Sequence, residues 1–186
     1  MNVSPIVIRR VVLRNYKSIA ACNVSLAPLT FLVGANGSGK SNFLDSLRFL
    51  SDSLRTSLDH ALRDRGTIKE VRRRSGGHPN HFALRVDFVL RDGSAGHYAF
   101  RVGAKPSGGY EVQNEECRLL PGEPGGESTH YHVRSGTVVQ SSHAQFPVTL
   151  PDRLALVAAA GWPAFRPVDD ALAAIEVYHL NPRAMS

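Results

Sequence analysis

A glycine-rich run that ends in a lysine and a serine holds the residues best suited to chemistry in this chain. Four residues separate Gly34 from Gly39-Lys40-Ser41, which matches the phosphate-binding P-loop pattern with no departure. Glycines let the backbone turn tightly and bring its N–H groups against phosphate oxygens. The Lys40 ammonium suits the β- and γ-phosphates, and the Ser41 hydroxyl suits Mg²⁺. The run therefore predicts a site for a nucleoside triphosphate, ATP with Mg²⁺. The candidate binding residues of this run are Gly34, Ala35, Asn36, Gly37, Ser38, Gly39, Lys40, Ser41 and Asn42, with Ser41 on the metal.

Such a loop needs a strand before it and a helix after it, and the sequence predicts both. The run Leu29–Val33 is apolar throughout except for Thr30, as in a buried strand, and it ends at Gly34. After the loop, apolar residues recur at intervals of three and four and form one helical stripe. The start of this helix would point its positive end at the phosphates. The stripe consists of Phe43, Leu47, Leu50, Leu54, Leu58 and Ala61.

Pattern divides the 186 residues into three regions of one α/β chain. Residues 1–62 form the P-loop core, with further strands expected at 6–13 and 24–26. Residues 63–150 form a β-rich lobe, because the hydrophobic period changes to two on both sides of the turn signal Asp92-Gly93 and predicts a hairpin. Residues 151–186 predict one or two short helices and a return strand. The shorter strands are expected at 110–112, 131–133, 146–150 and 174–180, with a Pro/Gly-rich loop at 121–126.

Composition limits the class of protein without selecting a partner. The chain is 42% hydrophobic, which is enough for one well-buried core. A net charge of +6 suits a nucleotide, a nucleic acid or an acidic partner equally. The two cysteines, Cys22 and Cys117, share no metal-ligand or redox spacing, so we expect both to be reduced and structural. The longest apolar stretch, 154–160, is too short for a bilayer, and the first ten residues lack signal-peptide features, so a cytoplasmic protein without membrane contact is expected.

Two segments carry a resemblance to a known group. The run from Val7 to Ile19, with Asn15-Tyr16-Lys17-Ser18 near its end, and the run from Leu29 to Leu44 resemble the start of ABC-type ATPases of the SMC/RecF-like group. They look most similar to bacterial predicted AAA-family ATPases that include OLD-like and phage-defence proteins. The segment 65–73 is also similar, and the resemblance loosens after roughly residue 75.

The resemblance implies an ABC-type head whose P-loop core carries an antiparallel β lobe. In this group the turn at Asn15–Ser18 lies near the nucleotide, so Lys17 is a candidate contact for base or phosphate, with a solvated turn residue as the alternative. A glutamine usually holds the metal and the attacking water in such heads. The candidates for it are Gln113, Gln140 and Gln145.

Two motifs that such ATPases need for hydrolysis have no convincing match. No apolar run ends in Asp-Glu, the Walker B pattern, since Asp169-Asp170 follows only Pro167-Val168. Ser75–His78 imitates the signature sequence, but it comes early and precedes Pro79. The resemblance therefore implies the N-terminal half of a head, to be completed by a further segment, a second head in a homodimer or a partner chain. We assign no catalytic residue and expect binding with little hydrolysis by this segment alone.

Further residues give weaker signals. A basic cluster suits DNA or RNA phosphates, although a solvated face is the alternative; it comprises Lys69, Arg72, Arg73 and Arg74. His130 and His132 would share one strand face, which gives half of a metal site at most. The leading hypothesis is a nucleotide switch that drives an effector, in DNA-linked or phage-defence processes. The alternatives are a non-catalytic, nucleotide-dependent interaction module and a basic nucleic-acid-binding protein.

Overall fold

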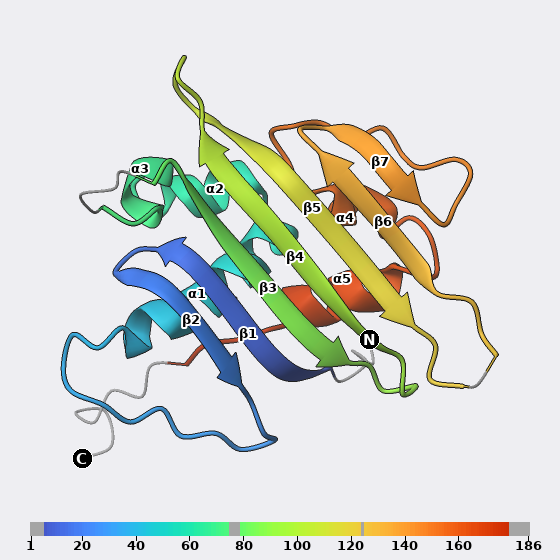
Figure 1. Ribbon diagram of the computed structural model, residues 1–186, viewed down its shortest axis with the longest axis horizontal. Helices are drawn as coiled ribbons and strands as arrows, with labels where there is room; N and C mark the ends of the chain where they lie inside the picture. The colour runs from blue at the N-terminus through green and yellow to red at the C-terminus, as the bar shows by residue number, and fades with distance from the viewer. Residues whose placement is uncertain (1–5, 75–78, 124, 179–186) are drawn as a thin grey trace.

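A seven-stranded antiparallel sheet dominates the chain. The computed structural model describes residues 6–74, 79–123 and 125–178. The strand order is β2-β1-β3-β4-β5-β6-β7, so the first two strands continue the sheet that the later strands build (Figure 1). The strands are β1 (Val7–Tyr16), β2 (Ile19–Ser25), β3 (His81–Val89), β4 (Ala95–Ala104), β5 (Tyr110–Leu120), β6 (Thr129–Arg134) and β7 (Thr137–Ser141).

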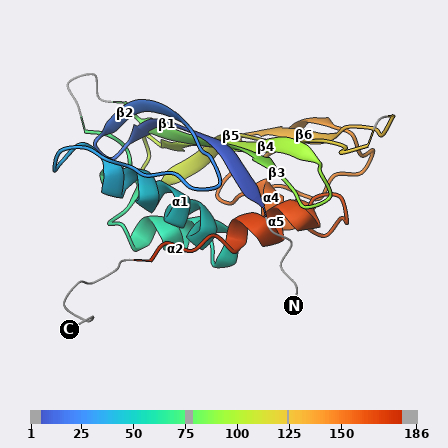
Figure 2. The same cartoon turned by 90° about the horizontal axis from the view of Figure 1, so that it is seen from below.

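The helices lie on one face of this sheet. Seen edge-on, the sheet forms one layer and the helices the other, and the second sheet face carries no helix (Figure 2). This is a two-layer arrangement in which both layers bury one apolar side. Within the described residues, no helix is both long and apolar enough to cross a membrane. The helices are α1 (Lys40–Arg55), α2 (Leu58–Arg63), α3 (Ile68–Val71), α4 (Ala155–Ala159) and α5 (Arg166–Ala173).

Aromatic side chains form the centre of the core between the layers. Phe49 on α1 meets Phe82 on β3 with ring centroids 5.4 Å apart, and Tyr16 on β1 meets Phe82 at 5.7 Å. Both contacts are edge-on, which is a favourable arrangement for aromatic pairs. The hairpin of β3 and β4 was predicted correctly, because alternate residues from Phe82 to Leu90 are buried. The predicted helical stripe is buried as well.

The prediction of a buried strand at Leu29–Val33 was wrong. The segment is irregular, and Leu29, Phe31 and Val33 are 73%, 79% and 92% exposed. The physical reason is the lack of a pairing partner. The strand β2 ends at Ser25 and pairs only with β1, and no strand in the described part of the chain pairs with residues 29–33. An apolar run becomes a buried strand only where a sheet receives it.

The helix after the loop is shorter than its apolar stripe. It ends at Arg55, and α2 begins after Ser57, whose hydroxyl accepts a hydrogen bond from His60 N at 3.0 Å. Serine is a favoured N-cap, so Ser57 starts a second helix and divides the stripe between α1 and α2.

Two further strands are longer than predicted, and two predicted strands do not form in the described residues. The strands predicted at 24–26 and 110–112 extend to 19–25 and 110–120, because each is paired along its length. The last strand is β7 and not 146–150, which is irregular. Residues 174–178 follow α5 without strand pairing, and 179–180 lie outside the described residues. The regions 1–62 and 63–150 share one sheet, since β1 pairs with β3.

Candidate functional site

The P-loop joins the exposed segment 29–33 to the first turn of α1. Gly39 is the residue before the helix and has φ 97°, and Gly37 has φ 79°. Both values lie in the left-handed region, which glycine enters without steric cost. Ser38 N donates to Ala35 O at 3.2 Å, and Phe43 N donates to Gly39 O at 2.8 Å. The two glycines therefore bend the chain so that the loop closes directly onto the start of the helix.

The Lys40 side chain folds back over the loop. Its ammonium donates to Gly34 O and Ala35 O, each at 2.7 Å, and to Ser38 Oγ at 3.2 Å. The Lys40 ammonium thus lies among the loop atoms that the P-loop pattern assigns to phosphate binding. Ser41 and Asn36 are exposed beside it. The predicted loop residues are therefore brought together in one place.

The turn between β1 and β2 lies against this loop. Asn42 Nδ2 donates to Ser18 Oγ at 2.7 Å. A Cβ on Gly39 would lie 3.3 Å from Ile19 Cγ1, which is tighter than ordinary contact. The structure therefore places Ser18 and Ile19 beside the start of α1, and it gives Asn42 the role of tying the two elements together.

Lys17 points to α1 and forms an ion pair there. Its ammonium lies 2.6 Å from Asp45 Oδ2, and the same carboxylate accepts from Tyr16 OH at 2.7 Å and from Arg65 Nε at 3.1 Å. Burial would raise the pKa of Asp45, but hydrogen bonds from Lys17 and Tyr16 and the charge of Arg65 outweigh it and lower the pKa. Asp45 is the residue that sequence reasoning missed. Its only signal was the four-residue spacing from Ser41, which places it one turn further along the same helix face.

The segment 65–73 holds the turn in place. Lys17 N donates to Val71 O and Arg73 N donates to Asn15 O, each at 2.7 Å. These bonds support two non-glycine residues with positive φ, Asn15 at 53° and Lys17 at 47°. The segment 65–73, which resembles the SMC/RecF-like group in sequence, therefore fixes the turn beside the P-loop.

Two of the four residues of the basic cluster have partners within the protein. Arg74 pairs with Glu70, and Arg72 Nη1 donates to Pro79 O at 2.8 Å. Arg65, next to the cluster in sequence, has only 8% of its side chain exposed and binds Asp45 and Asp52. Lys69 stays exposed. The cluster therefore offers less free positive charge than its sequence indicates.

The other predicted residues lie away from the loop. Gln113 is on β5, Gln140 is on β7 and Gln145 follows β7, and β3 and β4 separate all three from β1 (Figure 1). Asp169 and Asp170 lie in α5 and not at the end of a strand, and burial raises the pKa of Asp169 to about 6. Ser75–His78 lie outside the described residues.

The structure also describes the surroundings of the histidines and cysteines singled out in the sequence. His132 Nε2 lies 2.6 Å from Asn114 Oδ1, and no group of three His, Cys, Asp or Glu residues able to hold a metal occurs in 6–74, 79–123 and 125–178. Cys22 and Cys117 are both free thiols, and burial raises the pKa of each.

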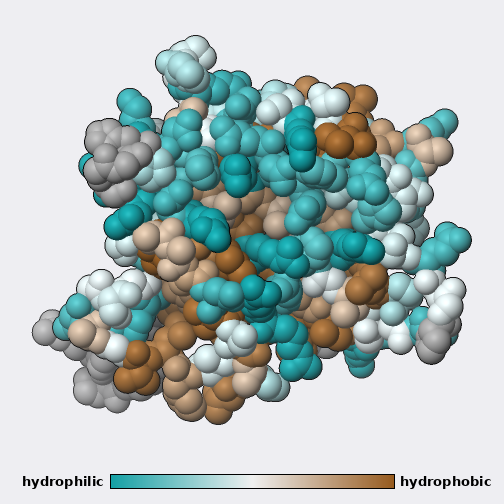
Figure 3. Space-filling model, in the orientation of Figure 1, coloured by the Kyte–Doolittle hydropathy of each residue, from teal (hydrophilic) through white to brown (hydrophobic). Residues whose placement is uncertain are grey.

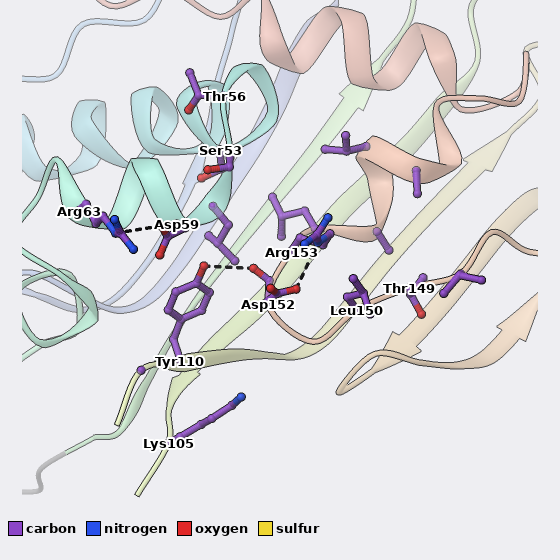
Figure 4. A pocket seen from close by; sticks show the side chains of 18 of the residues that line it. Ser53, Thr56, Asp59, Arg63, Lys105, Tyr110, Thr149, Leu150, Asp152 and Arg153 are labelled. Atoms are coloured by element: carbon purple, nitrogen blue, oxygen red, sulfur yellow. Dashed lines mark hydrogen bonds and ion pairs between the residues drawn. The ribbon is translucent and has the colours of Figure 1, made fainter. Parts of the chain in front are cut away.

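A pocket of about 770 Å³ lies at the opposite end of α1 from the P-loop (Figure 4). It is bounded by the end of α1, the hairpin between β4 and β5, and residues 148–158. Four of its charged residues form ion pairs, since Arg63 pairs with Asp59 at 2.9 Å and Arg153 with Asp152 at 3.2 Å, and Lys105 lines the pocket as well. Because α1 has 16 residues and is therefore about 24 Å long, this pocket is separate from the phosphate site.

Comparison with known families agrees with the site. The family model described as "AAA domain, putative AbiEii toxin, Type IV TA system" matches residues 29–137, which is more than half of the chain. No curated protein matches the chain. The match includes the whole P-loop, with the lysine folded over it and the helix that follows. The chain therefore belongs to this family of AAA domains, which are P-loop, ATPase-like domains.

Proposed function

We propose that this chain binds Mg-ATP through Gly34–Asn42. The observation that carries the proposal is the loop itself: glycines with positive φ at 37 and 39, a lysine ammonium held against the loop, and Ser41 exposed in the first helical turn. In the bound state the backbone N–H groups and Lys40 hold the phosphates, and the Ser41 hydroxyl holds Mg²⁺. The ion neutralises phosphate charge.

Lys17 and Asn42 belong to the same proposal as positioning groups. Lys17 is held by Asp45 at the start of α1, and Asn42 is held by Ser18. We propose that Lys17 reaches the base or a phosphate when nucleotide is bound, exchanging part of its pairing with Asp45.

We further propose that hydrolysis requires completion of an SMC/RecF-like head. The exposed run 29–33 supports this idea, because its backbone pairs with no strand in the described residues while Leu29, Phe31 and Val33 face solvent. A strand that supplies the Walker B carboxylates would pair there and bury this apolar face. A further segment, a second head or a partner chain would supply it, and the assembled switch would act in DNA-linked or phage-defence processes.

Calorimetry with ATP in the presence of Mg²⁺ tests the binding proposal. Lys40→Ala should weaken ATP binding about tenfold or more, since it removes a charge-assisted hydrogen bond to phosphate. Ser41→Ala should weaken binding only when Mg²⁺ is present. Lys69→Ala, which removes an equal charge at an exposed position outside the loop, is the matched control. Unchanged affinity in Lys40→Ala would refute the proposal.

Release of phosphate from ATP separates the catalytic from the non-catalytic role. The chain alone should release little phosphate, and a version that includes a Walker B and signature half should turn over. Lys40→Ala should abolish that turnover. Efficient turnover by the chain alone would contradict the need for completion, while ATP binding would remain a separate measurement.

A further inference from the structure

The sheet face without helices carries a dense array of arginines. Alternate strand residues from Phe82 to Leu90 are buried toward the helices, so the residues between them face the opposite side. This outer face looks toward the viewer in Figure 1, and Figure 3 shows hydrophilic side chains across its centre. We name it the arginine face after its six arginines: Arg10, Arg14, Arg85, Arg101, Arg118 and Arg134.

Strand register places three of these arginines in a row across the sheet. Arg14 on β1 lies opposite Ala83, which lies opposite Arg101 on β4, and Arg101 lies opposite Asn114 on β5. Arg134 follows Val133, the partner of Glu115, so it lies level with Asn114. All three side chains are exposed. From β1 to β6 the row covers four strand spacings, or about 19 Å.

Acidic residues neutralise only part of this face. Asp87 lies 2.6 Å from Arg85 and 3.6 Å from Arg10, and Glu116 lies 3.2 Å from His97 and 3.7 Å from Arg85. These two carboxylates thus engage two of the six arginines. Within the described residues, the other four have no acidic partner within 4 Å: Arg14, Arg101, Arg118 and Arg134. The face therefore carries uncompensated positive charge.

We infer that the arginine face binds double-stranded DNA through its phosphates. Duplex DNA carries one negative charge per about 1.7 Å when both strands are counted, so a duplex length of about 19 Å carries roughly eleven phosphates on its two strands. One guanidinium group can donate two parallel hydrogen bonds to the oxygens of one phosphate, which makes arginine the side chain best suited to this contact. The charge and the length of the row thus complement a duplex that crosses the strands.

The positions of the aromatic residues favour double-stranded over single-stranded DNA as the ligand of the arginine face. Single-stranded nucleic acid is held by aromatic side chains on which its bases stack. The aromatic residues of β3, β4 and β6 are all buried on the helix side, namely Phe82, Phe88, Tyr98, Phe100 and Tyr131. The described strands thus present no exposed Phe, Tyr or Trp on the outer face, and two of its histidines, His97 and His132, are paired with Glu116 and Asn114. Contacts to a nucleic-acid backbone therefore dominate, and we expect binding without sequence preference.

Fluorescence anisotropy with a labelled DNA duplex of about two helical turns tests the inference. The variant Arg14→Ala/Arg101→Ala/Arg134→Ala should lower affinity at least tenfold and reduce the slope of log K against log salt by about 2.7. The matched control is Arg48→Ala/Arg55→Ala/Arg63→Ala, which removes three exposed charges from the helix layer. Its affinity should stay within about twofold of the unchanged chain.

Two further measurements distinguish a loss of DNA binding at the arginine face from a loss of folding or of nucleotide binding. Arg14→Lys/Arg101→Lys/Arg134→Lys keeps the charges and should restore most of the binding. ATP affinity should be unaffected by the arginine variants, and DNA affinity should be unaffected by Lys40→Ala, so either site can fail alone. Equal losses in the two alanine triples would overturn the inference, as would preference for single-stranded DNA, double-stranded RNA or an acidic protein.

Discussion

Asp45 is the single residue that connects most of the parts around the P-loop. Its carboxylate joins Tyr16 and Lys17 of the β1–β2 turn to α1, and it accepts from Arg65 beyond α2. Its side chain is 23% exposed, and that of Arg65 is 8% exposed. An ion pair shielded from solvent in this way is costly to break, because the remaining cations lose their partner.

We predict that Asp45→Asn lowers the free energy of unfolding by about 1–3 kcal/mol at neutral pH. Denaturant unfolding followed by circular dichroism measures this change. Asp59→Asn, which removes an exposed carboxylate paired with Arg63, is the control and should cost at most about 0.5 kcal/mol. Equal effects of the two substitutions would contradict the role given to Asp45.

The same substitution has a pH dependence of known sign. The pKa of Asp45 is lowered in the folded chain, so its stabilisation is complete above the unfolded pKa and is lost as the pH falls through the folded pKa. The difference in stability between the unchanged chain and Asp45→Asn should therefore shrink from about pH 5 downward. A difference that stays constant to acid pH would show that the carboxylate charge is not responsible.

Glu115 is a fully buried acid on β5 that holds the start of α4 to the sheet. Oε1 accepts from Tyr98 OH, Tyr131 OH and Leu156 N at 3.0, 2.8 and 2.8 Å, and Oε2 accepts from Ala155 N at 2.6 Å. Burial raises the pKa of Glu115, and these four hydrogen bonds oppose that shift. All donors around the carboxylate are thus satisfied by two acceptor oxygens.

We predict that Glu115→Gln costs about 2–4 kcal/mol of stability, because its amide NH₂ must face a donor in place of one acceptor oxygen. Thermal unfolding measures the loss. Glu116→Gln is the control: it is the next residue, points to the outer face and is only half-buried, so its effect should be small. A stable Glu115→Gln protein would mean that α4 is held by packing alone.

The sequence predicted which segments form helices and strands from their local patterns. It could not predict which other segment each of them packs or pairs with. The periods of three to four residues in α1 and of two residues in β3 and β4 decide structure because each element buries one face of its own. The P-loop pattern likewise specified Gly39, Lys40 and Ser41 from spacing. The run 29–33 was misread because burial of a strand depends on a neighbour that no local pattern reveals. Asp45 was missed because a single polar residue in a helix does not show its partners.

The exposed run gives a test at this scale. Leu29→Ser/Phe31→Ser/Val33→Ser should leave the thermal midpoint within about 2 °C, because these side chains already face solvent. The triple change should also reduce self-association at high concentration, since it removes an exposed apolar stripe. Leu47→Ser, a single change on the buried side of α1, is the control and should cost about 3 kcal/mol. A large loss in the triple variant would place these side chains in the core.

The folded unit extends beyond the residues that match the family model. The match spans 29–137, but β1 lies between β2 and β3 in the sheet, and α4 and α5 cover its inner face (Figures 1 and 2). Ser51 on α1 donates to Ala173 O at 2.6 Å, so the P-loop helix is fixed by the end of α5. The segment that carries the motif therefore depends on residues on both sides of it.

We predict that a polypeptide of residues 29–137 alone does not fold. It lacks eight large, fully buried side chains: Val11, Leu13, Tyr16, Leu154, Leu156, Phe165, Val168 and Leu172. Their burial contributes roughly 12–24 kcal/mol of transfer free energy, which matches or exceeds the net stability of about 5–15 kcal/mol of a typical domain. Thermal unfolding followed by circular dichroism should show a cooperative transition for the full chain and none for the fragment. A cooperative transition in the fragment would mean that β3, β4 and β5 with α1 suffice as a core, and that the outer elements serve the site rather than the fold.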